Sequence, residues 1–220
     1  MTRALLDLSH HIEHGLVTYR GLPPPVIGDW LSREASVAKY APGTTFQIGK
    51  IEMIANTGTY IDAPFHRYAD GKDLADLPLE RVADLEGLVV RAAGSLRTLD
   101  ADRFRGVELQ GRAVLVHTGW DRHWGTERYF TGYPFLTAAA ARQLVDAGAA
   151  LVGIDSLNID DDGDPKRPVH TMLLGAGIPI VEHLCNLEAV PDEGFRFFAL
   201  PAKVRGMGSF PVRAIAVVER

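Results

Sequence analysis

One stretch in the middle of the chain constrains the fold most, because it contains strand, helix and strand signals in direct succession. Residues 113–117 (AVLVH) and 150–155 (ALVGID) are aliphatic runs that favour buried strands. Between them, residues 137–147 predict a helix, because Thr137 can accept a hydrogen bond from a free backbone N–H, alanines fill the interior and Gly148 ends it. This order predicts a β-α-β unit with a right-handed crossover.

The rest of the chain adds further strand signals and two shorter helix signals. Apolar runs bracketed by Gly or Pro predict strands at residues 49–55, 87–93, 178–181 and 212–218. Short helices are predicted after Asp76, in LPLERVADL, and at PVHTMLLGAG, which Gly175 and Gly177 would close. Nothing repeats at a fixed period, and no low-complexity linker divides the chain. We therefore predict a single mixed α/β domain over residues 1–220.

Composition limits the partners that such a domain would have. The 220 residues carry 23 basic and 28 acidic side chains, with no Lys/Arg run, which argues against nucleic acid binding. No stretch approaches the roughly 18 uninterrupted apolar residues of a membrane span, and the N-terminal apolar run is too short for a signal peptide. The single Cys185 excludes an internal disulfide and paired-cysteine metal motifs. We expect a cytoplasmic protein with no membrane partner.

Most of the eight histidines have an ordinary interpretation. His10 and His14 have helical spacing around a glutamate, but Gly15 and the preceding strand signal make a helical metal site unfavoured. His117 and His123 flank TGWDR, a strand end followed by a turn. A hydrogen-bonded surface or core role is favoured for both, and a position in a cleft stays open.

An acidic segment, NIDDDGD, resembles the front half of a calcium loop. Asn158, Asp160 and Asp162 stand at alternate positions, but Val169 occupies the place where a bidentate glutamate is required. A solvated acidic turn is therefore predicted. RGMGSFP lacks the third glycine of a dinucleotide site, and no Gly-x-Ser-x-Gly occurs.

Two segments, IANTGTYIDAPFHRYADG and RPVHTMLLGAGIPIVEHLCNL, combine residues suited to a site. Pro64 stiffens the chain between Asp62 and His66, which can hold a carboxylate and an imidazole in fixed relation. His170 opens a predicted helix. Glu182 ends an apolar strand, where an unpaired carboxylate would be costly, so a partner is expected. A metal ion, an arginine or a backbone N–H group could each be the partner of this carboxylate.

At these residues the sequence resembles the Putative cyclase family, which includes bacterial kynurenine formamidases and isatin hydrolases. The family signature is His-x-Gly-Thr-His-x-Asp-x-Pro-x-His, and TGTYIDAPFH follows most of it. The likeness extends through DLSHHI, HTGWDRHW, LVGIDSLNID, VHTMLLGAGIPIVEHLCNL and LPAKVRGMGSFPVRAIA. It implies a swivelling β/β/α domain with a barrel-like mixed sheet and peripheral helices. It also implies a divalent-metal hydrolase that forms a homodimer or homotetramer.

Two signature positions depart from the family pattern. Asp62 and His66 match, whereas Asn56 and Tyr60 stand where the first two histidines are expected. In members with two zinc ions, the resemblance assigns those histidines mainly to the first metal. Asn56 could offer an amide oxygen to a hard ion or hydrogen-bond a ligand. Tyr60, a phenol with a reference pKa of about 10, would fill the lost volume and donate a hydrogen bond to Asp62 or substrate.

The resemblance also assigns ligands and a reaction. Asp62, His170 and Glu182 would hold one divalent ion, manganese or zinc, which can be lost during purification because fewer nitrogen donors weaken the site. His66 would shuttle a proton between a metal-activated water and the leaving group of an amide, formamide, lactam or lactone. N-formylkynurenine is the favoured substrate of this class.

Two other interpretations stay open. A non-catalytic or metal-free relative would use Asn56 and Tyr60 to bind a small aromatic or carboxylate ligand. A metal-independent enzyme would use His66, oriented by Asp62, as a general base. Aromatic side chains that could stack on a ring substrate, or belong to the core, are Tyr19, Trp30, Phe65 and Trp120.

Overall fold

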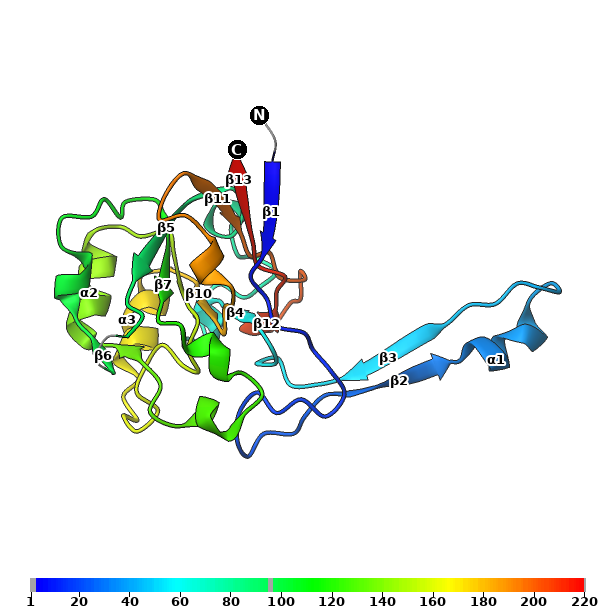
Figure 1. Ribbon diagram of the computed structural model, residues 1–220. Coiled ribbons are helices and arrows are strands. Elements are labelled where there is room, and N and C mark those ends of the chain that lie inside the picture. Colours follow the sequence, from blue (N-terminus) through cyan, green and yellow to red (C-terminus); the bar gives the residue numbers. More distant parts are fainter. Residues whose placement is uncertain (1–2, 95–96, 220) are drawn as a thin grey trace.

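The computed structural model describes residues 3–94 and 97–219, and its main element is a curled nine-stranded sheet (Figure 1). Its strands are β1 Arg3–Asp7, β4 Tyr60–Asp62, β5 Leu85–Arg91, β7 Ala113–His117, β9 Leu151–Ile154, β10 Ile180–Glu182, β11 Phe195–Phe198, β12 Ser209–Pro211 and β13 Ile215–Glu219. Their order across the sheet is β1-β13-β11-β5-β7-β9-β10-β4-β12. The central strands β5, β7, β9 and β10 are parallel, and the pairs outside them are antiparallel. The predicted mixed α/β class with a barrel-like sheet is confirmed.

Helices and short sheets surround this main sheet. The helices are α1 Arg33–Ser36, α2 Ala138–Asp146 and α3 Pro168–Gly175. Two-stranded sheets form from β2 Val26–Leu31 with β3 Ile48–Glu52, and from β6 Thr98–Leu99 with β8 Phe135–Leu136. Single 3-10 turns are η1 Val37–Lys39, η2 Pro64–His66, η3 Leu79–Arg81, η4 Ala101–Phe104, η5 Trp120–His123, η6 Glu127–Phe130 and η7 Leu187–Ala189. In the described ranges, no helix combines the length and apolarity needed to cross a membrane.

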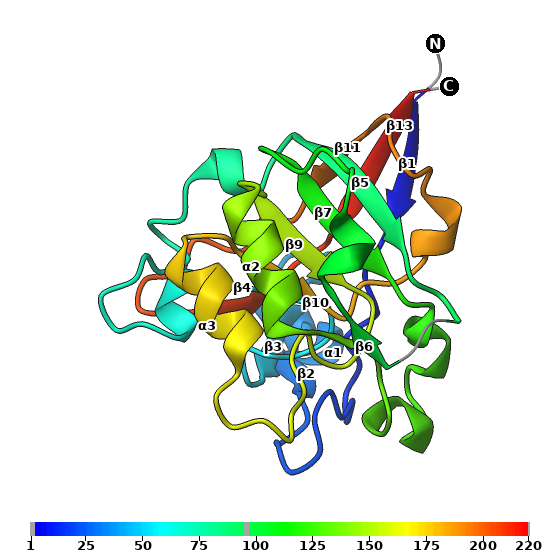
Figure 2. The same ribbon diagram turned by 90° about the vertical axis from the view of Figure 1, so that its left-hand side faces the viewer.

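The predicted β-α-β unit is present. Helix α2 connects β7 to β9, which are parallel neighbours. The Thr137 hydroxyl accepts a hydrogen bond from the Ala140 N–H at 3.2 Å, and Gly148 takes the left-handed conformation, with φ of 72°. The predicted helix at PVHTMLLGAG is also confirmed as α3. Both helices lie side by side over one face of the sheet (Figure 2).

Three sequence predictions need correction. The helix expected after Asp76 is only the short turn η3, because the proline at position 78 disfavours helical backbone at the preceding residue. Asp76 caps no helix and instead pairs with Arg205 at 3.0 Å. The strand predicted over residues 49–55 forms as β3 but pairs with β2, outside the main sheet. The strand predicted over residues 212–218 begins at Ile215.

The sheet separates two apolar clusters, which follow from the alternation of side chains along each strand. On β7, Val114 packs beneath α2 and α3, whereas Leu115 faces the opposite cluster inside the curl. Close packing there requires glycine at one position. A Cβ on Gly87 would lie 2.0 Å from the Phe195 ring. The Phe195 ring therefore fills the space beside Gly87, its partner on the neighbouring strand β5.

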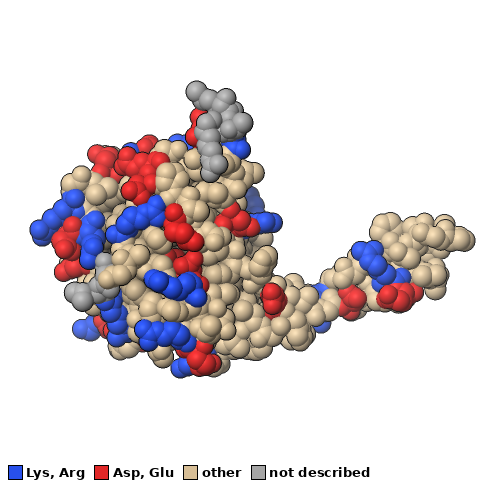
Figure 3. Space-filling view, in the orientation of Figure 1, with Lys and Arg blue, Asp and Glu red and all other residues tan. Residues whose placement is uncertain are grey.

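Strands β2 and β3, with α1 at their far end, form an arm over residues 26–52 that projects from the body (Figures 1 and 3). Ile27 lies opposite Ile51, and the register shifts between Asp29 and Leu31. The exposed apolar side chains of the arm are Val26, Ile27, Trp30, Val37, Tyr40, Phe46, Ile48 and Ile51. An isolated two-stranded hairpin is only marginally stable in water, and in this arm the apolar side chains are left exposed in the single chain.

Candidate functional site

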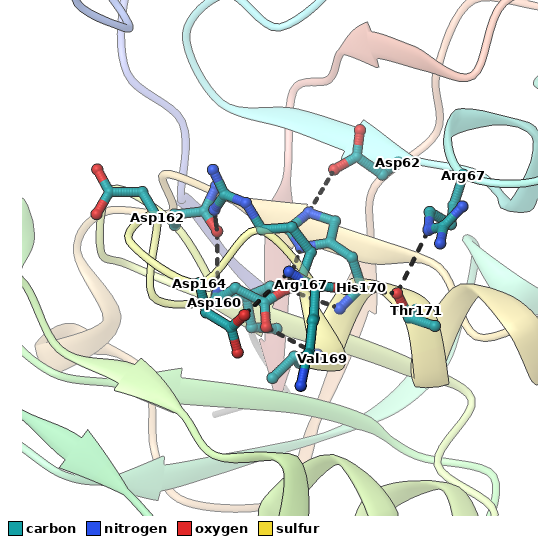
Figure 4. Close-up of polar contacts among 12 residues, drawn as sticks. Asp62, Arg67, Asp160, Asp162, Asp164, Arg167, Val169, His170 and Thr171 are labelled. Carbon is teal, nitrogen blue, oxygen red and sulfur yellow. Dashed lines mark hydrogen bonds and ion pairs between the residues drawn. The ribbon is translucent and has the colours of Figure 1, made fainter.

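The four residues predicted to form a metal and proton-transfer site come together beside β4 and β10. Asp62 ends β4, His66 ends the turn η2, His170 lies in the first turn of α3, and Glu182 ends β10. Donor atoms of Asp62, His66 and His170 all lie within 4.8 Å of one another. Figure 4 shows the Asp62 carboxylate facing the His170 ring. Segments far apart in sequence thus contribute to one cluster.

Asp62 places a free oxygen in the centre of this cluster. Its carboxylate is fully buried. Oδ1 accepts a hydrogen bond from the Ser209 hydroxyl, whereas Oδ2 has no hydrogen-bond partner among the described residues. Oδ2 lies 3.6 Å from Nε2 of His170. A buried carboxylate oxygen without a hydrogen bond is costly, and a cation at this point would compensate it.

The His170 ring is held by Asp160. Nδ1 lies 2.7 Å from Asp160 Oδ2, and the backbone N–H groups of Val169 and His170 also donate to this carboxylate, at 2.7 and 2.9 Å. Nε2 is left facing Asp62 and Glu182. Burial opposes the charged ring, but the hydrogen bond to Asp160 and the nearby negative charges of Asp62 and Glu182 raise the pKa of His170 to about 10. Asp160 is fully buried, so the prediction of a solvated acidic turn is wrong at this residue.

Ser209 links His66 to Asp62. The single hydroxyl proton of Ser209 goes to Asp62 Oδ1, so its oxygen accepts from Nδ1–H of His66 at 2.9 Å. With its proton on Nδ1, the neutral His66 ring has its free lone pair on Nε2, which can accept a proton or a hydrogen bond. The His66 side chain is 38% exposed, whereas those of Asp62 and His170 are buried. His66 is therefore the accessible member of the cluster.

Glu182 finds its expected partners within the protein. Oε1 accepts from the Ile159 N–H at 2.7 Å, and Oε2 accepts from the hydroxyls of Tyr60 and Tyr19, the latter at 3.2 Å. Oε1 is also 3.7 Å from Nε2 of His170. The hydrogen bond of Tyr60 goes to Glu182, which corrects the prediction that it would go to Asp62 or to substrate.

A cavity of about 380 Å³ opens onto this cluster. Asn56 and Tyr60 line it, together with His66, His170 and Glu182. Other lining residues are Tyr19, Leu22, Arg67, Asn158, Pro165, Lys166 and Arg167. A larger hollow of about 710 Å³ lies beyond Pro64, but none of the candidate ligands lines it. The smaller cavity is thus the one that joins open space to the candidate ligands.

Except for Tyr19, the other candidate residues lie apart from this site. His10 stacks on Trp124 with ring centroids 4.0 Å apart, and His14 accepts a hydrogen bond from the Ile27 N–H. His117 contacts Arg91. Of the aromatic candidates, Tyr19 lines the cavity and Trp30 lies on the arm. Trp120 is buried in a third apolar cluster, and Phe65 is half-buried. The histidine His123 packs edge-on against Trp120.

Sequence reasoning missed the residues that orient the cluster. In the sequence, Asp160 belongs to a segment typical of a solvated turn, and Ser209 belongs to RGMGSFP, which predicts no site. The one local signal was Gly208 beside Ser209. A Cβ at that glycine would lie 2.4 Å from the backbone nitrogen of His66, so the two segments need a residue without a side chain to approach.

Comparisons with known proteins find the same resemblance over the chain. A family described as "Putative cyclase" matches residues 6–161. A kynurenine formamidase of Bacillus cereus is 30% identical and aligned over 97% of both chains. That of Bacillus cytotoxicus is 32% identical, over 96% of this chain and 95% of its own.

Solved structures share the fold. A structure titled as a potential metal-dependent hydrolase with cyclase activity has a TM-score of 0.81, with 25% identity and full coverage of both chains. Isatin hydrolase A from Labrenzia aggregata, bound to benzyl benzoate, has a TM-score of 0.85 with 21% identity, over 99% of this chain and 94% of that one.

Proposed function

The chain belongs to the Putative cyclase family, and from that premise we propose that it is a metal-dependent hydrolase of a small amide, formamide, lactam or lactone. Its kynurenine formamidase relatives, aligned over nearly the whole chain, make it a hydrolase that acts on C–N bonds. The observation that carries the metal is Oδ2 of Asp62, a buried carboxylate oxygen without a hydrogen bond, aimed at Nε2 of His170.

The donor set fits a divalent ion. Asp62 and His170 would bind it, with Glu182 as the third ligand, and Asp160 would orient His170 by the carboxylate–histidine contact that is usual behind metal-bound imidazoles. One nitrogen and two carboxylate oxygens suit manganese or zinc. When bound there, such an ion polarises a carbonyl and lowers the pKa of water toward neutrality.

Proton transfer is assigned to His66. Nδ1–H is committed to Ser209, so Nε2 is the nitrogen that can take a proton from the attacking water and return it to the leaving group. The exposure of His66 at the cavity supports this role. Tyr60 and Tyr19 hold the Glu182 carboxylate in place, which keeps its charge beside His170.

The geometry also supports a second role for His66. Its donor atom belongs to the same 4.8 Å cluster as Asp62 and His170, while both oxygens of Glu182 already accept hydrogen bonds. In this alternative His66 is the third ligand, and Glu182 only supports the site. Metal titration separates the two assignments. His66→Gln would weaken ion binding if His66 is a ligand, whereas Glu182→Gln would weaken it if Glu182 is.

A metal-free relative that binds a small aromatic or carboxylate ligand is the alternative function. Two observations favour it. Both oxygens of Glu182 accept hydrogen bonds from the protein, and a charged His170 would balance Asp62 without an ion. If this metal-free relative is an enzyme, His66, oriented through Ser209, would act as its general base. Activity that survives exhaustive chelation would support this metal-free enzyme.

The deciding experiment is a thermal-shift titration with Mn²⁺, Zn²⁺ and Mg²⁺, combined with an arylformamidase assay. A bound ion stabilises the folded state by RT ln(1 + [L]/Kd), about 2.7 kcal/mol at 100 times Kd. His170→Ala should abolish both the shift and turnover, whereas His11→Ala, at an exposed position away from the cavity, should preserve both. No shift with any ion in the unmodified protein would overturn the metal assignment.

We also propose that the chain assembles as a homodimer or homotetramer. The exposed apolar side chains of the arm support this, because the arm packs against little of its own chain and a second copy would cover it.

A further inference from the structure

The wall of the site cavity carries an excess of positive charge. Three of its lining residues, Arg67, Lys166 and Arg167, are cationic, and the only carboxylate that lines it is Glu182. None of the three cations forms an ion pair with any part of the chain that the structure describes. Glu182 is fully buried and already accepts three hydrogen bonds. The accessible charge in the cavity is therefore positive.

Arg167 is held in an unusual backbone conformation that directs it to this wall. Its φ of 45° and ψ of 60° lie in the left-handed region, which a residue with a side chain seldom adopts. The conformation is maintained by its N–H, which donates to the Asp164 carbonyl at 3.1 Å, and by its carbonyl, which accepts from Thr171 N–H at 2.9 Å. Strained residues of this kind concentrate at ligand sites.

The guanidinium of Arg167 is anchored but not neutralised. Nη1 donates to Oδ1 of Asn158 at 3.1 Å, and the Asn158 amide donates to the Tyr19 hydroxyl at 3.2 Å. Tyr19 in turn contacts Tyr60 at 2.8 Å. Asn158 is a neutral, buried acceptor, so it fixes the position of the guanidinium without cancelling its charge. No described residue accepts a hydrogen bond from the other side-chain N–H groups of Arg167, so these donors can bind a ligand in the cavity.

Arg67 approaches the cluster from a different segment. Its Nε donates to the Thr171 hydroxyl at 3.3 Å, and its guanidinium carbon lies over the Tyr68 ring, 5.3 Å from the ring centroid. Figure 4 shows Arg67 and Arg167 reaching the neighbourhood of His170 from separate parts of the chain. Both contacts of Arg67 are with uncharged groups, so its charge also remains available.

We propose that the cavity contains an anion subsite centred on Arg167 and that the substrates are carboxylates. This inference rests on the proposed hydrolase function and specifies its substrate class: a small amide or formamide that carries a carboxylate in the same molecule. Arg167 binds the carboxylate through its planar pair of N–H donors, while the carbonyl to be cleaved lies at His66 and His170. Arg67 and Lys166 add attraction at longer range.

The test compares an acid with its neutral ester. N-formylanthranilate and its methyl ester are assayed as a matched pair, and dissociation constants of benzoate and methyl benzoate are measured calorimetrically. Arg167→Gln should raise KM for the acid about 10- to 100-fold more than it raises KM for the ester, which is the loss expected for a charge-assisted hydrogen bond. Arg167→Lys should fall between the two, because it keeps the charge but loses the paired donors.

The control is a second arginine that lies away from the cavity. Arg142→Gln, at an exposed position on α2, should change neither substrate, and melting temperatures establish that each variant is folded. If neither substrate is turned over but benzoate binds in an Arg167-dependent way, the proposed hydrolase function fails and the anion subsite stands. If Arg167→Gln affects acid and ester equally, or benzoate binding is indifferent to Arg167, the anion subsite is overturned.

Discussion

Asp62 and His170 show at the residue scale why one arrangement can hold either a proton or a metal ion. Their facing atoms, Oδ2 and Nε2, are 3.6 Å apart, and each residue is fixed from behind, Asp62 by Ser209 and His170 by Asp160. The carboxylates that favour a proton on His170 would favour a divalent cation for the same electrostatic reason. Residues behind the cluster therefore matter as much as those within it.

Ser209→Ala tests that support. Losing the hydroxyl would free Oδ1 of Asp62 and the Nδ1–H of His66, so both groups would lose their fixed orientation. We expect a decrease of about 10- to 100-fold in metal affinity or in kcat/KM, the usual effect of removing a residue behind a metal ligand. Ser32→Ala, on the arm, should change neither quantity, and an unchanged Ser209→Ala enzyme would contradict the orienting role.

Gly208→Ala tests the close approach beside His66. The new Cβ would lie 2.4 Å from the backbone nitrogen of His66 and 2.5 Å from its Cα, so the turn η2 would have to move. A displacement near 1 Å can cost about 100-fold in rate, and we expect kcat to fall on that scale. Gly28→Ala meets nothing within 4 Å and serves as the control. Normal turnover by Gly208→Ala would show that the position of His66 is not limiting.

Sequence could identify only part of this site. Asp62 and His66 were recognisable because their spacing is local and a proline stiffens the chain between them. Ser209 and Asp160 were not, because their roles depend on contacts with residues far away in the chain or across a turn. Tyr60 was identified, but its partner Glu182 lies opposite it on the neighbouring strand, a pairing that only the sheet register reveals.

At the scale of elements, local sequence signals predict whether a segment forms a helix or a strand better than they predict which sheet a strand joins. The helix α2 and the strands around it formed as expected, since capping and apolar patterning agree there. The strand predicted over residues 49–55 also formed, but in the arm. Its apolar pattern resembles that of a core strand, although Ile51 and the adjacent Ile48 are exposed in the single chain. A sequence cannot tell whether apolar positions are covered by their own chain or by another.

The double variant Ile27→Lys with Ile51→Glu tests whether a second copy covers the arm. These residues are directly opposite on β2 and β3, so the substitution exchanges an apolar pair for a cross-strand ion pair that is compatible with the hairpin. We expect light scattering to show the wild type as an oligomer and the variant as a monomer. Leu79→Lys, at a residue that is 66% exposed on the body, should leave the assembly intact. A wild type that is monomeric would overturn the proposed assembly.

For the whole molecule, the mixed sheet followed from the resemblance, but its full strand order did not follow from local patterns. Strands of three or four residues, such as β4, β11 and β12, carry too little periodicity to be recognised alone. They are fixed by long-range pairing and by the two apolar clusters that the sheet separates. The same burial leaves some polar side chains with limited access to water.

His10 makes global stability sensitive to acid. Burial, together with the neighbouring charge of His11, lowers the pKa of His10 to about 4 from an ordinary value near 6.5. Between these values the unfolded chain binds more protons, so stability is fully present above pH 6.5 and decreases as pH falls toward 4. His10→Phe, which preserves stacking on Trp124, should flatten the dependence of the urea midpoint on pH across that interval. An unchanged slope would contradict this origin.

The strand β12 has only one neighbour in the sheet, β4, and is three residues long. Fraying of such a border costs much less free energy than unfolding the protein. Because Ser209 stands on it, a brief detachment would release His66 and Asp62 while the apolar cluster beneath α2 and α3 stays packed. A low concentration of denaturant should therefore abolish turnover before the circular dichroism signal changes. The amide protons of β12 should also exchange with deuterium earlier than those of β7.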